Sequence, residues 1–361
     1  MDLDEKYDLI TRGIVEVITA SELRKLLENV DKPKAYIGFE PSGLVHVGWL
    51  IWMNKVRDFI KAGVDMYVLE ATWHAYINDK LGGNMDLIRT AAKFVKKVME
   101  AYGIDVSPIK FVDAEDLVSD KKYWELVIKS AKNVSLARVK RALTIMGRRA
   151  GEAESDASKI IYPLMQVVDI MYLDLDIALG GTDQRKAHML QRDIAEKMGL
   201  KKAIAVHTPL LVSLSGPEKK MSEELEVDDY LSEVKMSKSK PETAIFVHDS
   251  PEEIELKIAR AYCPPREVEL NPVIQLVKYV LFSRKFTLRI ERSMKYGGDL
   301  EVNSFSELEK MYEEGAVHPQ DLKRSVAKAL AEHLKPIRIF IESDQEAREL
   351  LWKLNRAKIT R

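Results

Sequence analysis

Two short stretches, almost two hundred residues apart, carry residue types that could bind the phosphates of a nucleotide. The first is His46-Val47-Gly48, which follows the apolar run Ala35–Phe39 and the turn Pro41-Ser42-Gly43. Beyond it the apolar residues recur at helical spacing until Gly63, which predicts a strand, a turn and a helix in immediate succession. A helix N-terminus offers free N–H groups and a positive dipole to an anion. His46 would add a donor, and Gly48 would let a nucleotide lie against bare backbone.

The second stretch is Lys235–Ser239, which reads KMSKS. Lys235 and Lys238 stand three residues apart in a small polar loop, so both could reach a triphosphate and neutralise a departing pyrophosphate. Either stretch alone is a weak signal, because loop histidines and solvated lysines are common. A partial echo, Lys220-Met221-Ser222, lacks the trailing lysine and serine and is interpreted as unrelated.

A third group of polar residues predicts a pocket rather than a phosphate site. Tyr162, Gln166 and Asp169 are spaced by four and three residues, so one helical face carries all three. Their neighbours are apolar, and a core helix would normally bury an apolar face. The spacing therefore favours a polar binding pocket, with a structural hydrogen-bond network as the alternative.

Together these motifs resemble the signatures of class I aminoacyl-tRNA synthetases, HIGH and KMSKS. The surrounding words are similar to those of tyrosyl-tRNA synthetases of the archaeal and eukaryotic kind: YIGFEPSG, HAYIND, IYPLMQVVD, GGTDQRK and AYCPP. The resemblance covers nearly the whole chain. It departs from the family at Trp49, where a second histidine is usual, and at Thr72, where the usual word ADLHAY has an acid.

The resemblance implies that the protein activates L-tyrosine with ATP and transfers it to the 3′ end of tRNA(Tyr). Tyr36 and Asp169 would contact the phenolic hydroxyl, with a weaker contribution from His74. The ammonium group would be held by Tyr162, Gln166 and Gln184. On the ATP side the implied residues are Gly38, His46, Gly48, Asp183, Lys235 and Lys238, of which His46, Gly48 and the two lysines would act in catalysis. Mg²⁺ would arrive with ATP and leave with pyrophosphate, and no structural metal is expected. Trp49 is left out of the expected site.

The expected tRNA contacts fall in two places. Between Lys121 and Arg149 there are nine Lys or Arg residues against one acid, a candidate electrostatic footprint for phosphates. By resemblance Lys140 and Arg141 in this segment would contact the first base pair of the tRNA acceptor stem. Their alternative interpretation is ordinary surface charge. In the C-terminal part Tyr296, His318 and Asp321 are candidates for the anticodon. An exposed aromatic ring can stack on a base and a carboxylate can accept from guanine, while a helix N-cap is the competing role for Asp321.

The strand, helix and strand expected over 35–71 predict an α/β fold with parallel strands. The resemblance implies a Rossmann-type doubly wound parallel sheet with a helical insertion, followed by an all-helical C-terminal domain. Strands are expected at the ranges 35–39, 64–71, 109–112, 177–180 and 203–213, and the long helical runs at 88–102, 123–146 and 322–341. The expected boundaries are an N-terminal helical segment at 1–34, a catalytic domain at 35–250 and an anticodon-binding domain at 251–361. The insertion would occupy 82–157, and the KMSKS loop region 214–240.

Composition is that of an ordinary globular protein. A chain of 361 residues, 46% hydrophobic, has room for two domains, and its formal net charge of −1 gives no sign of RNA by itself. The acidic start and the lack of a long apolar run lead us to expect a cytoplasmic protein without membrane contact. A single cysteine, Cys263, excludes an internal disulfide and a cysteine-based zinc site. A homodimer is expected from the family and from the commonness of two-fold pairs.

Three alternatives remain open at this stage. A tryptophanyl-tRNA synthetase shares the fold, but Tyr36 and Asp169 favour a ring that carries a hydroxyl. A nucleotidyltransferase that acts on a small acid without tRNA would explain the two phosphate motifs and leave the basic segment without a role. A non-catalytic tRNA-binding relative would have no need of Lys235 and Lys238.

Overall fold

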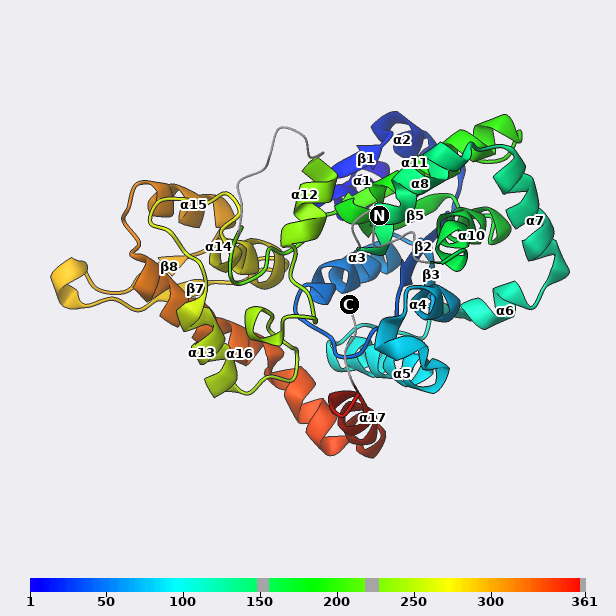
Figure 1. Ribbon diagram of the computed structural model, residues 1–361. Coiled ribbons are helices and arrows are strands. Elements are labelled where there is room, and N and C mark those ends of the chain that lie inside the picture. Colours follow the sequence, from blue (N-terminus) through cyan, green and yellow to red (C-terminus); the bar gives the residue numbers. More distant parts are fainter. Residues whose placement is uncertain (148–155, 218–226, 358–361) are drawn as a thin grey trace.

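A six-stranded sheet forms the centre of the computed structural model, which describes residues 1–147, 156–217 and 227–357 (Figure 1). The spatial order is β1-β6-β5-β2-β3-β4. Neighbouring strands are parallel throughout except at the edge, where β1 runs antiparallel to β6. The strands are β1 (Glu16–Ile18), β2 (Lys34–Phe39), β3 (Asp65–Glu70), β4 (Lys110–Asp113), β5 (Ile177–Gly181) and β6 (Ile204–Thr208).

Helices cover both faces of the sheet, which is why the central strands read as nearly continuous apolar runs. One face packs against α3 (Trp49–Lys61) and α5 (Met85–Ala101), and the other against α10 (Ser158–Tyr172) and α11 (Arg185–Lys197). From β2 the chain continues to β3 and β4 in one direction, and from β5 it continues to β6 in the other. In such a sheet a ligand crevice opens at the carboxyl ends of the two strands where the order reverses, here β2 and β5.

The expected α/β fold and its strands are confirmed, and three details of the expected boundaries need correction. The N-terminal segment has helices α1 (Leu3–Thr11) and α2 (Ala20–Asn29), but between them β1 joins the sheet, so this segment is not only helical. The range 82–157 is not a separate insertion, because it supplies α5 and strand β4 of the same sheet. The predicted run 123–146 is broken near Asn133 into α7 (Lys121–Lys132), α8 (Leu136–Ala142) and a 3-10 turn, η2 (Leu143–Met146). Ser135 caps the N-terminus of α8, which explains why a new helix starts after the break.

Short elements connect the main ones. They are α4 (Thr72–Ile77), η1 (Lys80–Gly83), α6 (Ala114–Val118), η3 (Thr182–Gln184), α12 (Val227–Val234) and η4 (Pro241–Thr243). Most of the expected KMSKS loop region is described, but the partial echo at 220–222 lies outside the described residues.

The C-terminal part is helical, as expected, with one addition, a β-hairpin formed by β7 (Leu288–Ile290) and β8 (Leu300–Val302). Its helices are α13 (Pro251–Arg260), α14 (Pro272–Leu276), η5 (Val277–Leu281), α15 (Phe305–Glu313), α16 (Pro319–Ser343) and α17 (Gln345–Asn355), and η6 (Met294–Tyr296) forms the hairpin tip. The long helix α16 runs from the hairpin side back toward the sheet, and α17 lies beside α5 (Figure 1). There Lys97 forms ion pairs with Asp344 at 3.1 Å and Glu346 at 2.9 Å. One apolar cluster continues from α3 and α5 into these helices.

No described helix is both long enough and apolar enough to cross a membrane.

Candidate active site

A cavity of about 1250 Å³ opens where β2 and β5 end. Its wall includes every residue that the sequence assigned to tyrosine or ATP: Tyr36, Gly38, His46, Gly48, His74, Tyr162, Gln166, Asp169, Asp183, Gln184, Lys235 and Lys238. They come from β2, the turn between β2 and α3, α4, α10, η3 and the KMSKS loop. The fold therefore brings all twelve together, although they span two hundred residues of sequence.

In the turn between β2 and α3 the imidazole of His46 lies against Gly48. His46 is 9% exposed, and its Nδ1 accepts a hydrogen bond of 3.2 Å from the Gly48 N–H. A Cβ at Gly48 would lie only 2.9 Å from the imidazole, so this position requires glycine. Burial, reinforced by Lys238 and Lys235, lowers the pKa of His46 well below its usual range. His46 is therefore neutral, and it can meet a phosphate only by hydrogen bonding.

The turn is also joined to the segment that follows KMSKS. His46 forms a β-bridge with Phe246, and the Val47 N–H donates to the Ile245 carbonyl at 2.9 Å. Because this backbone connection is direct, a movement of the KMSKS segment would displace His46 as well.

The two KMSKS lysines are held on different sides of the cavity. Lys235 pairs with the carboxylate of Asp183, whose side chain is 10% exposed. Lys238 donates to the Ser42 hydroxyl at 3.0 Å, and its ammonium lies 4.0 Å from the ring centroid of Trp49. Burial, together with Lys80, lowers the pKa of Lys238 well below its usual range, while Glu40 opposes the shift. An anion at this point would restore the charged form.

The contact with Lys238 corrects the omission of Trp49 from the expected site. Trp49 lines the cavity and offers its ring face to the ammonium, a cation–π contact, where the family pattern has a histidine. The tryptophan thus replaces a polar contact with an aromatic one.

At the other end of the cavity a buried carboxylate is held between two rings. Asp169 is 1% exposed; its Oδ1 accepts from the Tyr123 hydroxyl at 2.7 Å, and its Oδ2 lies 3.1 Å from His74 Nε2. Tyr36 is also buried, and burial and the charge of Asp169 raise the pKa of its phenol. It is therefore a neutral hydroxyl that can donate or accept. This end of the cavity presents an anionic acceptor and a phenol to a ligand hydroxyl.

Between the two ends lies a set of acceptors suited to a cation. The Tyr162 hydroxyl donates to Glu40 Oε1 at 2.7 Å, and Gln166 Nε2 donates to Gln184 Oε1 at 3.1 Å. The remaining Gln166 oxygen is buried and has no hydrogen-bond partner among the described residues. An ammonium group would satisfy it and would be attracted by Glu40.

Sequence reasoning missed Tyr123 and Glu40. Glu40 carried a recognisable signal, because an acid directly after a buried strand lies at the sheet's ligand-binding edge. It also accepts two hydrogen bonds from Asn78 and pairs with Lys80 at 3.6 Å. Tyr123 carried no such signal, because nothing in its own stretch distinguishes it from a core aromatic residue.

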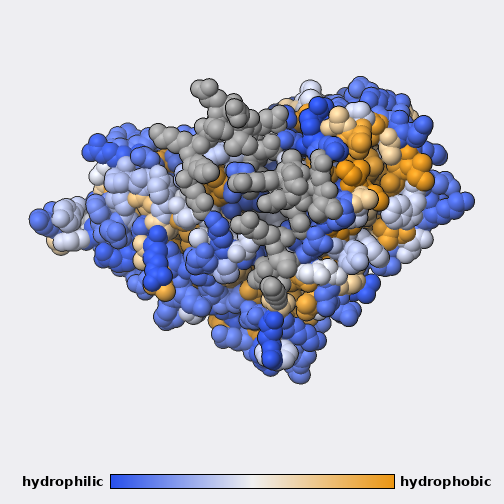
Figure 2. Space-filling model, viewed as in Figure 1, coloured by the Kyte–Doolittle hydropathy of each residue, from blue (hydrophilic) through white to orange (hydrophobic). Residues whose placement is uncertain are grey.

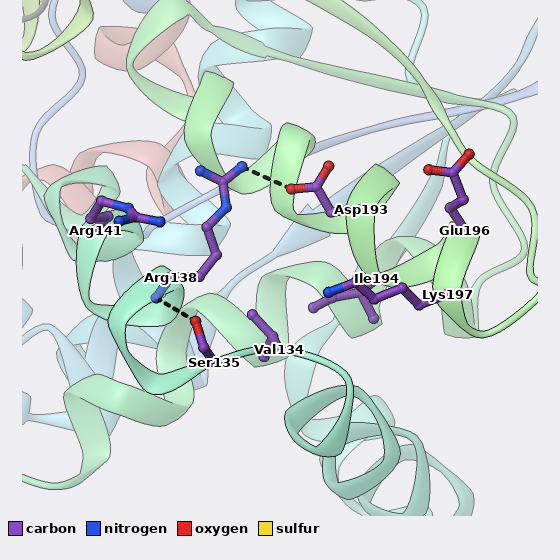
Figure 3. Close-up of a pocket in the computed structure, with 8 residues that line it drawn as sticks. All are labelled: Val134, Ser135, Arg138, Arg141, Asp193, Ile194, Glu196 and Lys197. Carbon is purple, nitrogen blue, oxygen red and sulfur yellow. Dashed lines mark hydrogen bonds and ion pairs between the residues drawn. The ribbon is translucent and has the colours of Figure 1, made fainter.

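The expected tRNA residues lie outside this cavity. Lys140 and Arg141 belong to α8, and Arg141 borders a smaller hollow of about 370 Å³ between α8 and α11 (Figure 3). Basic side chains of Arg138 and Lys197 border it too, and Arg138 pairs with Asp193 at 2.8 Å. The basic segment thus has a concave surface of its own.

The C-terminal candidates lie on two elements. Tyr296 is 64% exposed at the hairpin tip, next to Met294. The N-cap of α16 is His318, whose Nδ1 accepts from the Gln320 N–H at 3.2 Å. The alternative role of Asp321 as an N-cap is therefore wrong. Asp321 lies in the first turn of the helix, with Arg324 3.7 Å away.

Comparison with known proteins identifies the class of protein that this fold and this cavity define. The family model described as "tRNA synthetases class I (W and Y)" matches residues 28–226 and 227–335. The chain therefore belongs to this family of class I tRNA synthetases.

Two relatives within the family are tyrosine–tRNA ligases. The chain is 58% identical to the tyrosine–tRNA ligase of Aeropyrum pernix over 362 residues, 100% of this chain and 99% of that protein. It is also 58% identical to that of Saccharolobus solfataricus, over 99% and 98% of the two chains. A crystal structure of tyrosyl-tRNA synthetase from Aeropyrum pernix matches with a TM-score of 0.88 and 53% identity, covering 98% of this chain and 99% of the other.

The structure of tyrosyl-tRNA synthetase complexed with L-tyrosine from Pyrococcus horikoshii has a TM-score of 0.89 and 42% identity, covering 98% of this chain and all of the other. These matches group the chain with the archaeal tyrosyl-tRNA synthetases and confirm the resemblance seen in its motifs.

Proposed function

We propose that this protein activates L-tyrosine with ATP and then transfers the tyrosyl group to tRNA(Tyr). The observation that carries the proposal is the joint position of Asp169 and the two KMSKS lysines in one cavity. A buried, hydrogen-bonded carboxylate suits a phenolic hydroxyl, and lysines at the far end suit a triphosphate. The relatives named as tyrosine–tRNA ligases and the tyrosine-bound structure support the same assignment.

In the first step the tyrosine carboxylate attacks the α-phosphorus of ATP, the bond to the bridging oxygen breaks, and pyrophosphate leaves. No covalent enzyme intermediate is needed, so the chain contributes position and charge. Tyr162, Gln166 and Gln184 would fix the ammonium group, and Tyr36 and Asp169 the phenol. Gly38, His46, Gly48 and Asp183 would line the ATP side, with Asp183 binding the ribose hydroxyls.

Lys235 and Lys238 would neutralise the charge that develops on the departing pyrophosphate. Lys235 first has to exchange its partner Asp183 for phosphate, and Lys238 its partner Ser42. Burial lowers the pKa of Lys238 and so disfavours its charged form in the empty site. An arriving phosphate would favour the charged form and pair with it. Both lysines would therefore form their phosphate interactions only when ATP is bound.

Mg²⁺ would be carried by ATP and by pyrophosphate. Among residues 1–147, 156–217 and 227–357 no group of three His, Cys, Asp or Glu side chains is arranged to hold a metal ion. Bound to the phosphates, the cation would supply additional charge neutralisation.

Selection of tyrosine over phenylalanine follows from the buried polar groups. Without the ligand hydroxyl, Tyr36 and Asp169 would face an apolar ring with their hydrogen-bonding capacity unused, which is costly in a buried site.

In the second step the terminal ribose of tRNA(Tyr) attacks the tyrosyl-adenylate and releases AMP. Lys140 and Arg141 would contact the first base pair. Tyr296, His318 and Asp321 would contact the anticodon, the ring by stacking and the carboxylate by accepting from guanine.

A homodimer is part of the proposal. Figure 2 shows hydrophobic side chains gathered on the side of the molecule where α7, α8 and α10 lie. Exposed apolar residues of these helices include Trp124, Ile128, Leu136 and Ile161, and Ile128 is 64% exposed. A patch of this kind suits burial against a second copy.

The experiment that tests the proposal is ATP–pyrophosphate exchange without tRNA, in the presence of tyrosine, tryptophan or phenylalanine. Exchange with tyrosine alone is expected. Exchange driven by tryptophan would replace the amino acid in the proposal, and no exchange with any of the three would refute the catalytic part.

A further inference from the structure

Asn78 is a fully buried amide that contacts two residues of the cavity wall. It is 0% exposed and follows directly after α4. Its Nδ2 lies 2.9 Å and 3.1 Å from the two carboxylate oxygens of Glu40 and 3.0 Å from the Met146 carbonyl oxygen. Glu40 and Met146 both line the cavity, whereas Asn78 is not part of its wall. The proposed function gives Asn78 no role.

The orientation of this amide follows from its partners. A main-chain carbonyl only accepts hydrogen bonds, and so does a carboxylate. The atom of Asn78 that faces both must therefore be the NH2 group, which has one hydrogen for Met146 and one for Glu40. Asn78 thus joins Glu40, which directly follows β2, to the end of η2.

The backbone around Asn78 is held in an unusual turn. Asp79 and Leu81 both have a φ of 53°, a left-handed conformation that is costly for residues other than glycine. The buried ammonium of Lys159, from α10, pairs with Asp79 at 2.7 Å and donates to the Ile77 carbonyl. Lys159 therefore anchors the chain on both sides of Asn78. This anchored turn restricts where the Asn78 side chain can point.

Glu40 is contacted by hydrogen-bond donors and approached by lysines. The Tyr162 hydroxyl donates to it at 2.7 Å, and burial and the charge of Glu40 raise the pKa of this phenol well above its usual range, so it stays a donor. Lys80 lies 3.6 Å from Glu40, and the charge of Glu40 opposes the lowering of the Lys238 pKa. A carboxylate free to move would pair with these lysines. The donors of Asn78 and Tyr162 oppose that movement.

The contact with Tyr162 places the Glu40 carboxylate beside the acceptors suited to an ammonium group. Tyr162 and Gln166 share one face of α10, and Gln166 has a buried oxygen without a hydrogen-bond partner among the described residues. A carboxylate has about four acceptor sites, so the two donors leave Glu40 able to accept from a ligand as well. Its negative charge is the feature that a substrate ammonium requires.

We propose that Asn78 is a positioning residue that holds the Glu40 carboxylate against Tyr162, where it binds the ammonium group of the substrate. This role rests on the proposed function, which supplies the substrate. Asn78 acts through Glu40 and so determines affinity for the amine.

Binding of two tyrosine analogues to the whole chain, without ATP, tests this role. Tyramine keeps the phenol and the ammonium group, and 3-(4-hydroxyphenyl)propanoate keeps the phenol but has no ammonium group. Asn78→Asp retains the shape but puts an acceptor where the donor was, and Asn78→Ala removes the amide. In both variants Kd for tyramine should rise about tenfold, whereas Kd for the propanoate should change less than about twofold.

Equal losses for the two analogues would overturn the proposal, because Asn78 would then only support the fold. Asn54→Ala is the matched control: Asn54 is also a buried amide, donates to Tyr102 and Ser283 at 3.1 Å each, and lies outside the cavity wall. It should keep the wild-type preference for tyramine, and a shift like that of the Asn78 variants would also overturn the proposal. If Asn78→Ala does not fold, the isosteric Asn78→Asp decides alone.

The wild-type protein separates this role from the proposed function. If it binds neither tyrosine nor tyramine, the proposed function fails, and the role of Asn78 fails with it. If it binds both and the variants keep its preference for tyramine, only the role of Asn78 is refuted.

A double-mutant cycle tests whether Asn78 acts through Glu40. Glu40→Gln removes the charge and should itself weaken tyramine binding by about tenfold or more. In that background Asn78→Ala should change Kd for tyramine by less than about twofold, because the carboxylate that it positions is gone. A further loss as large as that in the wild-type background would refute the proposal.

Discussion

The hydroxyl of Tyr123 donates a hydrogen bond of 2.7 Å to Oδ1 of Asp169, and both side chains are almost completely buried. Burial raises the pKa of Tyr123 well above its usual range, and the charge of Asp169 adds to the shift, so the phenol remains protonated and can only donate to the carboxylate. Helix α7 thus fixes the orientation of a carboxylate that belongs to α10. The proposed phenol site depends on a residue more than forty positions away.

Tyr123→Phe should therefore weaken recognition of the substrate hydroxyl. A hydrogen bond to a charged group contributes about 2 kcal/mol, so kcat/KM for tyrosine should fall on the order of tenfold or more. Tyr172→Phe is the control, because Tyr172 is a neighbouring ring that bonds to Asp120 instead. Steady-state kinetics with tyrosine and phenylalanine measure the effect, and equal losses in the two variants would contradict a specific role of Tyr123.

Asp169→Asn removes the charge but keeps the shape. Discrimination between tyrosine and phenylalanine should fall by about tenfold or more, while KM for ATP should change less, because the lysines that we propose bind the phosphates lie at the other end of the cavity. Pyrophosphate exchange with each amino acid gives both numbers. Unchanged discrimination would remove Asp169 from the phenol site.

Trp49→Leu removes the ring that lies 4.0 Å from the Lys238 ammonium. A buried cation–π contact contributes about 1 to 2 kcal/mol, so the variant should lose roughly fivefold to thirtyfold in kcat/KM for ATP. Trp49→Phe keeps an aromatic face and should lose less. A Leu variant as active as the Phe variant would show that Trp49 only fills space.

Stability below neutral pH should depend on His333, which joins α16 to the catalytic part. Burial, together with Arg284 and Arg57, lowers its pKa to about 4, and its Nε2 lies 3.1 Å from the Tyr102 hydroxyl. The unfolded chain takes up this proton near pH 6.5 and the folded chain only near pH 4, so stability is present above pH 6.5 and is lost as the pH falls toward 4.

The size of this effect follows from the two pKa values. Between pH 7 and pH 5 the free energy of unfolding should fall by about 2 kcal/mol on account of His333 alone. His333→Gln, which keeps an acceptor, should be less sensitive to pH by about that amount in urea unfolding, provided that unfolding is reversible. His318→Gln, at an exposed helix cap, should keep the wild-type pH dependence. If His333→Gln also keeps it, His333 is not the group responsible.

Local sequence determined the parts of this protein that depend on neighbouring residues. The apolar runs became β2, β3, β5 and β6 because parallel strands covered on both faces must be apolar. The spacing of Tyr162, Gln166 and Asp169 predicted a shared face, and all three line the cavity. Short motifs were enough to identify His46, Gly48 and the KMSKS lysines as candidate site residues.

Only the tertiary structure decided which distant residues complete these sites. Tyr123 reaches Asp169, Trp49 meets Lys238, and Asn78 contacts Glu40, in each case across elements that are far apart in sequence. The same holds for β1, three residues long, whose place at the sheet edge comes from pairing with β6. A periodic pattern reports which face of an element is buried, but not which element covers it. Partner identity depends on how helices and strands pack, and that is a property of the whole chain.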